Sequence, residues 1–115
     1  MGRDSTGKPK SEVLPGTLEM LILQTLRRRQ MHGYGIAQLI RQASEDVLQI
    51  EEGSLYPALQ RLELKDWVTA EWRTTENNRR ARYYCITPAG RRQLDVEAAD
   101  FGRVVTAIAR IMTPA

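Results

Sequence analysis

The sequence predicts a mainly α fold with one small β-hairpin, in the α+β class. Apolar residues recur at helical spacing in four segments, and two alternating segments within residues 67–87 enclose a polar loop. A chain of 115 residues is long enough for a single domain with one modest core. Its 42% apolar and 27% charged residues are typical of a soluble globular domain. We therefore expect all elements to share one core.

Two helices are predicted in the first half of the chain. The first follows the turn at Leu14–Gly16, with Thr17 as its N-cap. Its buried stripe should consist of Leu18, Leu21, Ile22, Thr25 and Leu26. Three arginines, residues 27–29, end this helix, where cations complement the carbonyl end. After a break at Met31–Gly33, a second helix should run from about Tyr34 to Ala43, with an inner face of Ile36, Ala37 and Ile40.

The third predicted helix runs from about Glu52 to Lys65, after a short β-prone run at Val47–Ile50. Pro57 lies in its second turn, where the missing N–H removes one backbone hydrogen bond. The inner face should consist of Leu55, Ala58, Leu59 and Leu62. The opposite face carries Gly53, Ser54, Pro57, Gln60, Arg61 and Leu64. This second face is polar enough to be exposed.

Two alternating segments, residues 67–73 and 81–87, predict a β-hairpin whose tip turns at Asn77-Asn78. Residues 73–92 contain six arginines and one acid, Glu76, within an overall net charge of +3. Such a basic hairpin suits contact with phosphates, although a solvated arginine-rich surface has the same composition. Alternation separates Arg82 and Tyr84 from Tyr83 and Cys85, so at least one tyrosine should be core, and Cys85 is expected to be a buried small residue.

A last helix of about 24 residues should begin at Thr87-Pro88, an N-cap followed by a proline at the first helical position. Apolar residues follow at heptad spacing, and Val104 and Ile111 widen the stripe. A small domain leaves little core to cover this stripe, so we interpret it as a subunit contact; the alternative is a helix folded back on its own domain. The expected dimerisation residues are Leu94, Ala98, Phe101, Val104, Val105, Ile108, Ile111 and Met112.

This order of elements is that of a winged helix-turn-helix, here with a C-terminal dimerisation helix. Residues 14–88 should form the winged-helix domain and residues 89–115 the dimerisation helix. Residues 1–13 are polar and are expected to be a flexible arm. The arm is interpreted as a simple tail, with contact to a phosphate backbone as the alternative.

The segments LPGTLEMLIL, HGYGIAQLI, EEGSLYPALQRLE and NNRRARYYCITPAGRRQL resemble the PadR family of bacterial transcription regulators, from about Leu14 to Leu94. The resemblance implies a homodimeric repressor whose C-terminal helix mediates dimerisation and whose DNA affinity falls when a small molecule binds. The chain is similar to the short subfamily with one C-terminal helix. Some members of the family bind planar drugs with a tryptophan on the C-terminal helix, whereas the only aromatic residue in the C-terminal helix of this chain is Phe101. The glycine that usually follows the recognition helix in this family is Asp66 here, which predicts a slightly different turn into the wing.

The winged-helix arrangement assigns the expected DNA contacts by position. Ser54, Gln60 and Arg61 should reach base edges in the major groove. Tyr34 and Tyr56 should donate hydroxyls to phosphates, with packing as an equal alternative for Tyr56. The wing should contact phosphates or the minor groove through Asn78, Arg79, Arg80 and Arg82.

The expected function is therefore sequence-specific DNA binding by a homodimeric repressor, released from a pseudo-palindromic operator by a small-molecule effector. The alternative is a winged-helix protein-interaction or ligand-sensing module with secondary DNA binding. With one histidine, His32, and one cysteine there is no zinc set, and no glycine-rich phosphate loop or catalytic pair is present, so neither an enzyme nor a cofactor is expected. His32 should be a structural turn residue, with phosphate contact as the alternative. No apolar run is long enough for a membrane span, and we expect a cytoplasmic protein that associates with the bacterial nucleoid on DNA.

Overall fold

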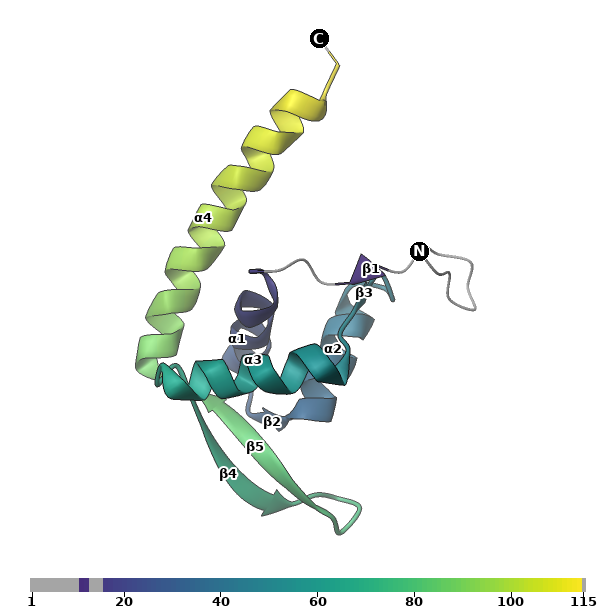
Figure 1. The fold of residues 1–115 in the computed structure, drawn as a ribbon, viewed down its shortest axis with the longest axis vertical. Helices are drawn as coiled ribbons and strands as arrows, with labels where there is room; N and C mark the ends of the chain where they lie inside the picture. The colour runs from purple at the N-terminus through teal and green to yellow at the C-terminus, as the bar shows by residue number, and fades with distance from the viewer. Residues whose placement is uncertain (1–10, 13–15, 115) are drawn as a thin grey trace.

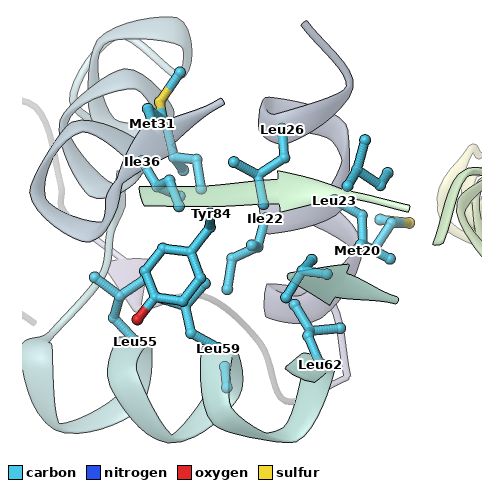
Figure 2. Packing of buried hydrophobic residues seen from close by; sticks show 14 of the residues in the cluster. Met20, Ile22, Leu23, Leu26, Met31, Ile36, Leu55, Leu59, Leu62 and Tyr84 are labelled. Atoms are coloured by element: carbon cyan, nitrogen blue, oxygen red, sulfur yellow. The ribbon is translucent and has the colours of Figure 1, made fainter. Parts of the chain in front are cut away.

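Three helices pack around one hydrophobic core in this computed structural model, which describes residues 11–12 and 16–114 (Figures 1 and 2). They are α1 (Leu18–Arg28), α2 (Gly33–Ala43) and α3 (Glu52–Leu64), and α3 continues through Pro57. The hairpin β4 (Val68–Thr74) and β5 (Arg80–Ile86) follows, and then the long helix α4 (Pro88–Met112). The predicted fold class, mainly α with a small sheet, is confirmed.

Helix α1 occupies the middle of the core, because it contacts α2, α3, α4 and β5. Because of this central position, α1 buries a wider face than the single stripe that was predicted for it. Leu23 and Met20 are buried, although neither was predicted, whereas Leu18 and Leu21 are only partly buried. The inner face predicted for α3 is confirmed. The largest fully buried side chains are Ile22, Leu23, Leu26, Ile36, Leu55, Leu59, Leu62, Val68 and Leu94.

The main sheet has three antiparallel strands in the order β2-β5-β4. Its third strand is β2 (Met31–His32), which lies where the sequence predicted only a break and pairs with Tyr84 and Tyr83. The β-prone run does contain a strand, β3 (Leu48–Gln49), but this strand belongs to a separate two-stranded sheet. Its parallel partner is β1 (Ser11–Glu12), so these two residues of the expected flexible arm are paired; the rest of the arm lies outside the described residues.

The turn from α3 into the wing has the hydrogen bonds of a Schellman motif. The Trp67 N–H donates to the carbonyl of Leu62 and the Asp66 N–H donates to that of Glu63, both at 3.0 Å. Asp66 has a φ of 59°, in the left-handed region that favours glycine. Asp66 therefore holds a backbone conformation that glycine adopts without strain.

The first turn of α4 is anchored to this same turn. The Thr87 hydroxyl donates to the carbonyl of Asp66 at 2.7 Å and accepts from the N–H of Gly90 at 3.0 Å, which confirms Thr87 as the N-cap. A Cβ atom built on Gly90 would overlap the carbonyl oxygen of Trp67. The backbones of α4 and the α3–β4 turn are therefore in direct contact, and only glycine fits between them.

Beyond its first two turns, α4 leaves the domain and projects away from it (Figure 1). Leu94 is fully buried in the core of its own domain, so its assignment to the dimerisation surface was wrong. Arg27 of α1 pairs with Asp95 just after it. All residues from Ala98 to Pro114 are exposed, which excludes a helix folded back on its own domain over this range. None of the described helices is long and apolar enough to cross a membrane.

Candidate nucleic-acid interface

A groove of about 710 Å³ lies between α3, the start of α2 and the β4–β5 hairpin. In Figure 1 the hairpin extends past α3 on the side away from the free end of α4. The structure brings six of the nine predicted DNA-contact residues together along this groove. They are Tyr34, Tyr56, Gln60, Arg79, Arg80 and Arg82. Ser54, Arg61 and Asn78 do not line it.

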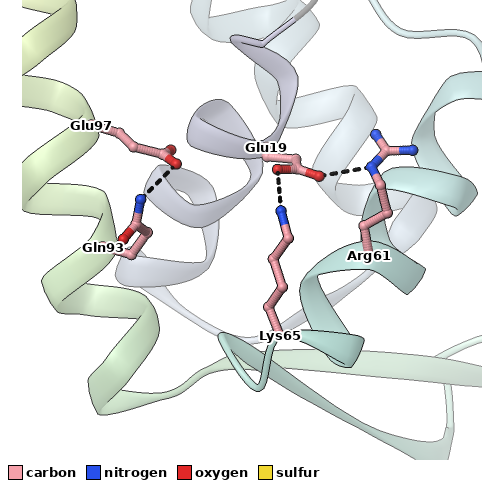
Figure 3. A network of polar contacts seen from close by, with 5 residues as sticks. All are labelled: Glu19, Arg61, Lys65, Gln93 and Glu97. Carbon is pink, nitrogen blue, oxygen red and sulfur yellow. Dashed lines mark hydrogen bonds and ion pairs between the residues drawn. The ribbon is translucent and has the colours of Figure 1, made fainter.

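Arg61 lies on the flank of α3 away from the groove, where it is paired with α1 (Figure 3). Its Nε donates to Oε1 of Glu19 at 2.8 Å, and Lys65 Nζ lies 3.5 Å from the other oxygen of the same carboxylate. Ser54 precedes Arg61 by seven residues and so shares this flank. The exposed side of α3 therefore has two edges, Gln60 on the groove edge and Arg61 on the other.

The tip of the wing is closed by a short network around Thr75. The Thr75 N–H donates to the Arg79 carbonyl at 2.6 Å, and the Arg79 and Asn78 N–H groups donate back to the Thr75 hydroxyl and carbonyl. Asn78 takes the left-handed conformation with a φ of 59°, which supports its predicted turn role. Arg79 and Arg80 are exposed, and neither pairs with a carboxylate among residues 16–114.

Two aromatic side chains not selected from the sequence contribute to the groove wall. Trp72 is 59% exposed, and the Arg80 guanidinium lies 5.6 Å from its ring centroid. Alternation along β4 puts Trp72 on the same strand face as the buried Val68, so the sequence does contain a signal for its position. Because the wing extends past the core, that face changes from buried to exposed along β4. Tyr84 is buried at the inner end of the groove, and this burial raises the pKa of its hydroxyl although the nearby Arg82 charge opposes the shift.

The start of α2 supplies the remaining groove wall. His32 is the N-cap of α2: its Nδ1 accepts a hydrogen bond from the Gly35 N–H at 3.0 Å, which confirms its structural turn role. Tyr56 packs on Gly33, where an added Cβ would lie 2.9 Å from the tyrosine ring, yet 46% of Tyr56 stays exposed. Tyr34 is exposed and stacks on His32, with the two ring centroids 6.4 Å apart. Both tyrosines therefore remain accessible to a ligand in the groove.

Cys85 is exposed, so the prediction that it is a buried small residue was wrong. Its strand neighbours Tyr84 and Ile86 point into the core, and alternation turns Cys85 to the other face of the sheet. No group of three or more metal-ligating side chains occurs within the described parts of the chain.

Helix α3 beside a basic two-stranded wing defines the chain as a winged helix-turn-helix protein. Residues 22–96 match the transcriptional regulator PadR-like family, and the chain belongs to this family of transcription regulators, which are not enzymes. The fold is similar to a transcriptional regulator from Clostridium thermocellum, with a TM-score of 0.78 and 26% identity over 85% of this chain and 95% of that one. A PadR family regulator from Clostridium difficile gives a TM-score of 0.74 and 25% identity, over 85% of this chain and all of that one. The "Uncharacterized protein X" of Lysinibacillus sphaericus is 30% identical over 83% of this chain and 87% of its own length.

Proposed function

We propose that this PadR-like regulator is a homodimeric repressor that binds a pseudo-palindromic operator and is released by a small-molecule effector. The observation that carries the proposal is the groove between α3 and the wing. It gathers two arginines without carboxylate partners among the described residues, two accessible tyrosines and one glutamine on the exposed edge of a helix. These are the side chains that bind phosphates and base edges in DNA.

In the proposed complex, α3 enters the major groove with Gln60 facing the bases. An amide side chain in this position can make a bidentate contact to adenine. Tyr34 and Tyr56 lie beside α3 and donate hydroxyls to the adjacent phosphates. Arg79 and Arg80 lie at the wing tip, far enough from α3 along the hairpin to reach the flanking backbone or minor groove.

The dimer is proposed from the exposed apolar stripe of α4. Phe101, Val104, Val105, Ile108 and Ile111 are each more than 40% exposed, on a helix segment in which every residue from Ala98 to Pro114 is exposed. A monomer would leave this stripe in water, whereas pairing two copies at heptad spacing buries it. Two copies also present two α3 helices, which suits half-sites one helical turn of DNA apart or a multiple of it.

Repression and release by an effector follow from the resemblance to the family and form the regulatory half of the proposal. The protein would act on the nucleoid in the cytoplasm. A ligand that binds the free dimer better than the DNA-bound dimer would release the operator by mass action. Screening small amphiphilic compounds for loss of operator binding tests this half separately.

The decisive experiment is selection of bound duplexes from a random DNA pool, followed by measurement of affinity against salt concentration. We expect an enriched sequence with approximate twofold symmetry and an affinity that falls steeply with salt. The competing function, a protein-interaction or ligand-sensing module, predicts no enriched sequence and salt-insensitive binding to a partner. That result would overturn the proposal.

A further inference from the structure

One arginine of the groove, Arg82, is held by a carboxylate of α3. Its Nη2 donates to Oε1 of Glu63 at 2.9 Å and its Nη1 donates to Oε2 at 3.3 Å, so the contact is bidentate. The guanidinium also lies 6.0 Å from the Tyr84 ring centroid. Two N–H groups that would otherwise fit a phosphate are therefore already bound to Glu63.

The groove thus contains arginines in two different states. Arg79 and Arg80 at the wing tip have no carboxylate partner within residues 16–114 and carry their full charge toward a ligand. Arg82 and Glu63, deeper in the groove, form a pair with no net charge. Attraction of DNA without regard to sequence depends on the number of phosphates that cations neutralise. The pair contributes nothing to that number while it stays closed.

The pair is poorly suited to a purely structural role. The Arg82 side chain is 41% exposed and that of Glu63 is 24% exposed, and ion pairs at such positions contribute little to folding stability. An uncompensated carboxylate in this groove would repel phosphates. Glu63 also lies one turn after Gln60, on the same groove edge of α3. Its place is therefore within the surface that faces DNA.

We propose that Glu63 is a specificity-determining residue, which lowers sequence-independent DNA affinity by keeping Arg82 from phosphates. This inference rests on the proposed DNA-binding function. A non-specific complex can shift along DNA until each free arginine meets a phosphate, whereas base contacts hold the specific complex in one register. Releasing Arg82 therefore strengthens non-specific binding more than operator binding. The Arg82–Glu63 ion pair therefore widens the difference between operator affinity and non-specific affinity, and this difference is the specificity.

The test compares four proteins: the wild type, Glu63→Gln, Arg82→Met and the double variant. Affinity is measured against salt for a selected operator and for an unselected duplex of equal length. With Glu63→Gln, we expect the slope of log affinity against log salt on the unselected duplex to steepen by about 0.9, the increment for one added phosphate contact. The ratio of operator to unselected affinity should fall several-fold. Arg82→Met leaves Glu63 uncompensated, so it should lower the affinity for both duplexes, whereas the double variant, which lacks both charges, should keep the wild-type slope.

Each contrary outcome has a distinct meaning. An unchanged slope in Glu63→Gln shows that Arg82 gains no phosphate contact when its carboxylate is removed, and a double variant with a slope shallower than the wild type by about 0.9 shows that Arg82 already binds phosphate; either result overturns the inference. A steeper slope that persists in the double variant assigns the effect to another cation and also overturns it. If the wild type itself has no salt dependence, the DNA-binding function fails first. Equal thermal unfolding midpoints of the four proteins exclude misfolding as the cause.

Discussion

Arg61 on α3 donates from its Nε to the Glu19 carboxylate of α1 at 2.8 Å, and this contact turns it away from the groove that Gln60 lines. Two adjacent residues, both expected at base edges, therefore differ in what they can do. Gln60 already faces the groove and is available to a base, whereas Arg61 must first leave a carboxylate.

This difference predicts unequal effects of alanine substitution on operator recognition. We expect Gln60→Ala to lose about 1–3 kcal/mol of discrimination at one base pair, because it removes a bidentate contact. Arg61→Ala should change discrimination less, since its guanidinium is held by Glu19. Binding of each variant to single-base operator substitutions measures both effects. A larger loss of discrimination in Arg61→Ala would show that the Glu19 contact opens on DNA.

The wing tip should supply salt-dependent affinity. We expect Arg79→Ala and Arg80→Ala each to make the slope of log affinity against log salt shallower by about 0.9, because each removes one phosphate contact. Arg110→Ala is the matched control, since this arginine lies near the end of α4 and far from the groove. Slopes that stay at the wild-type value in both wing variants would remove the wing from the interface.

The apolar stripe of α4 should control the oligomeric state. We expect Phe101→Asp and Val105→Asp to yield monomers in sedimentation velocity, because each places a charge in the middle of the paired stripe. Val96→Asp is the control: Val96 is also exposed on α4, but helical spacing puts it on the opposite face. A dimer that survives both Phe101→Asp and Val105→Asp contradicts the heptad pairing.

Gly90 should be sensitive to the smallest possible side chain. Gly90→Ala directs a Cβ into the Trp67 carbonyl, and the backbone shift this requires should lower the free energy of unfolding by about 1–3 kcal/mol. Gly53→Ala is the matched control, because a Cβ at that helical glycine meets no atom within 4 Å. Urea denaturation compares the two. Equal stability of Gly90→Ala and the wild type would mean that α4 can move off the turn at no cost.

Asp66 offers the opposite test, a substitution that should stabilise. Its φ of 59° costs an L-residue conformational energy that glycine avoids, so Asp66→Gly should raise the free energy of unfolding by about 1 kcal/mol. Asp66→Asn should lie closer to the wild type, since asparagine tolerates this conformation only somewhat better. Chemical denaturation measures this change in the free energy of unfolding, provided that its dependence on denaturant concentration is the same in both proteins. A loss of stability on Asp66→Gly would show that the aspartate side chain makes a stabilising contact of its own.

The helices and the hairpin could be predicted from periodicity and capping residues, because these signals are local. The confirmed inner face of α3 and the N-cap at Thr87 are examples. The third strand, Met31–His32, was missed because two residues carry no alternation, and only the distant β5 makes them a strand. Leu94 was assigned to the wrong surface for a related reason. Heptad spacing shows which face is apolar, but not where the core ends along the helix.

The candidate site was predictable in composition and less so in detail. The groove contains most of the expected residues, since helix and hairpin faces follow from spacing. The carboxylates Glu19 and Glu63 lie 42 and 19 residues from the arginines they hold, and no local pattern links such pairs. Whether an arginine is free or neutralised therefore had to come from the structure.

The anchored first turn of α4 has a mechanical consequence. Because Thr87 and Gly90 fix that turn to the backbone between α3 and the wing, α4 moves as one body with the DNA-facing elements. A helix of 25 residues spans about 37 Å, so it acts as a lever arm. In a dimer paired along these arms, a small change in their crossing angle would be amplified into a change in the spacing of the two α3 helices.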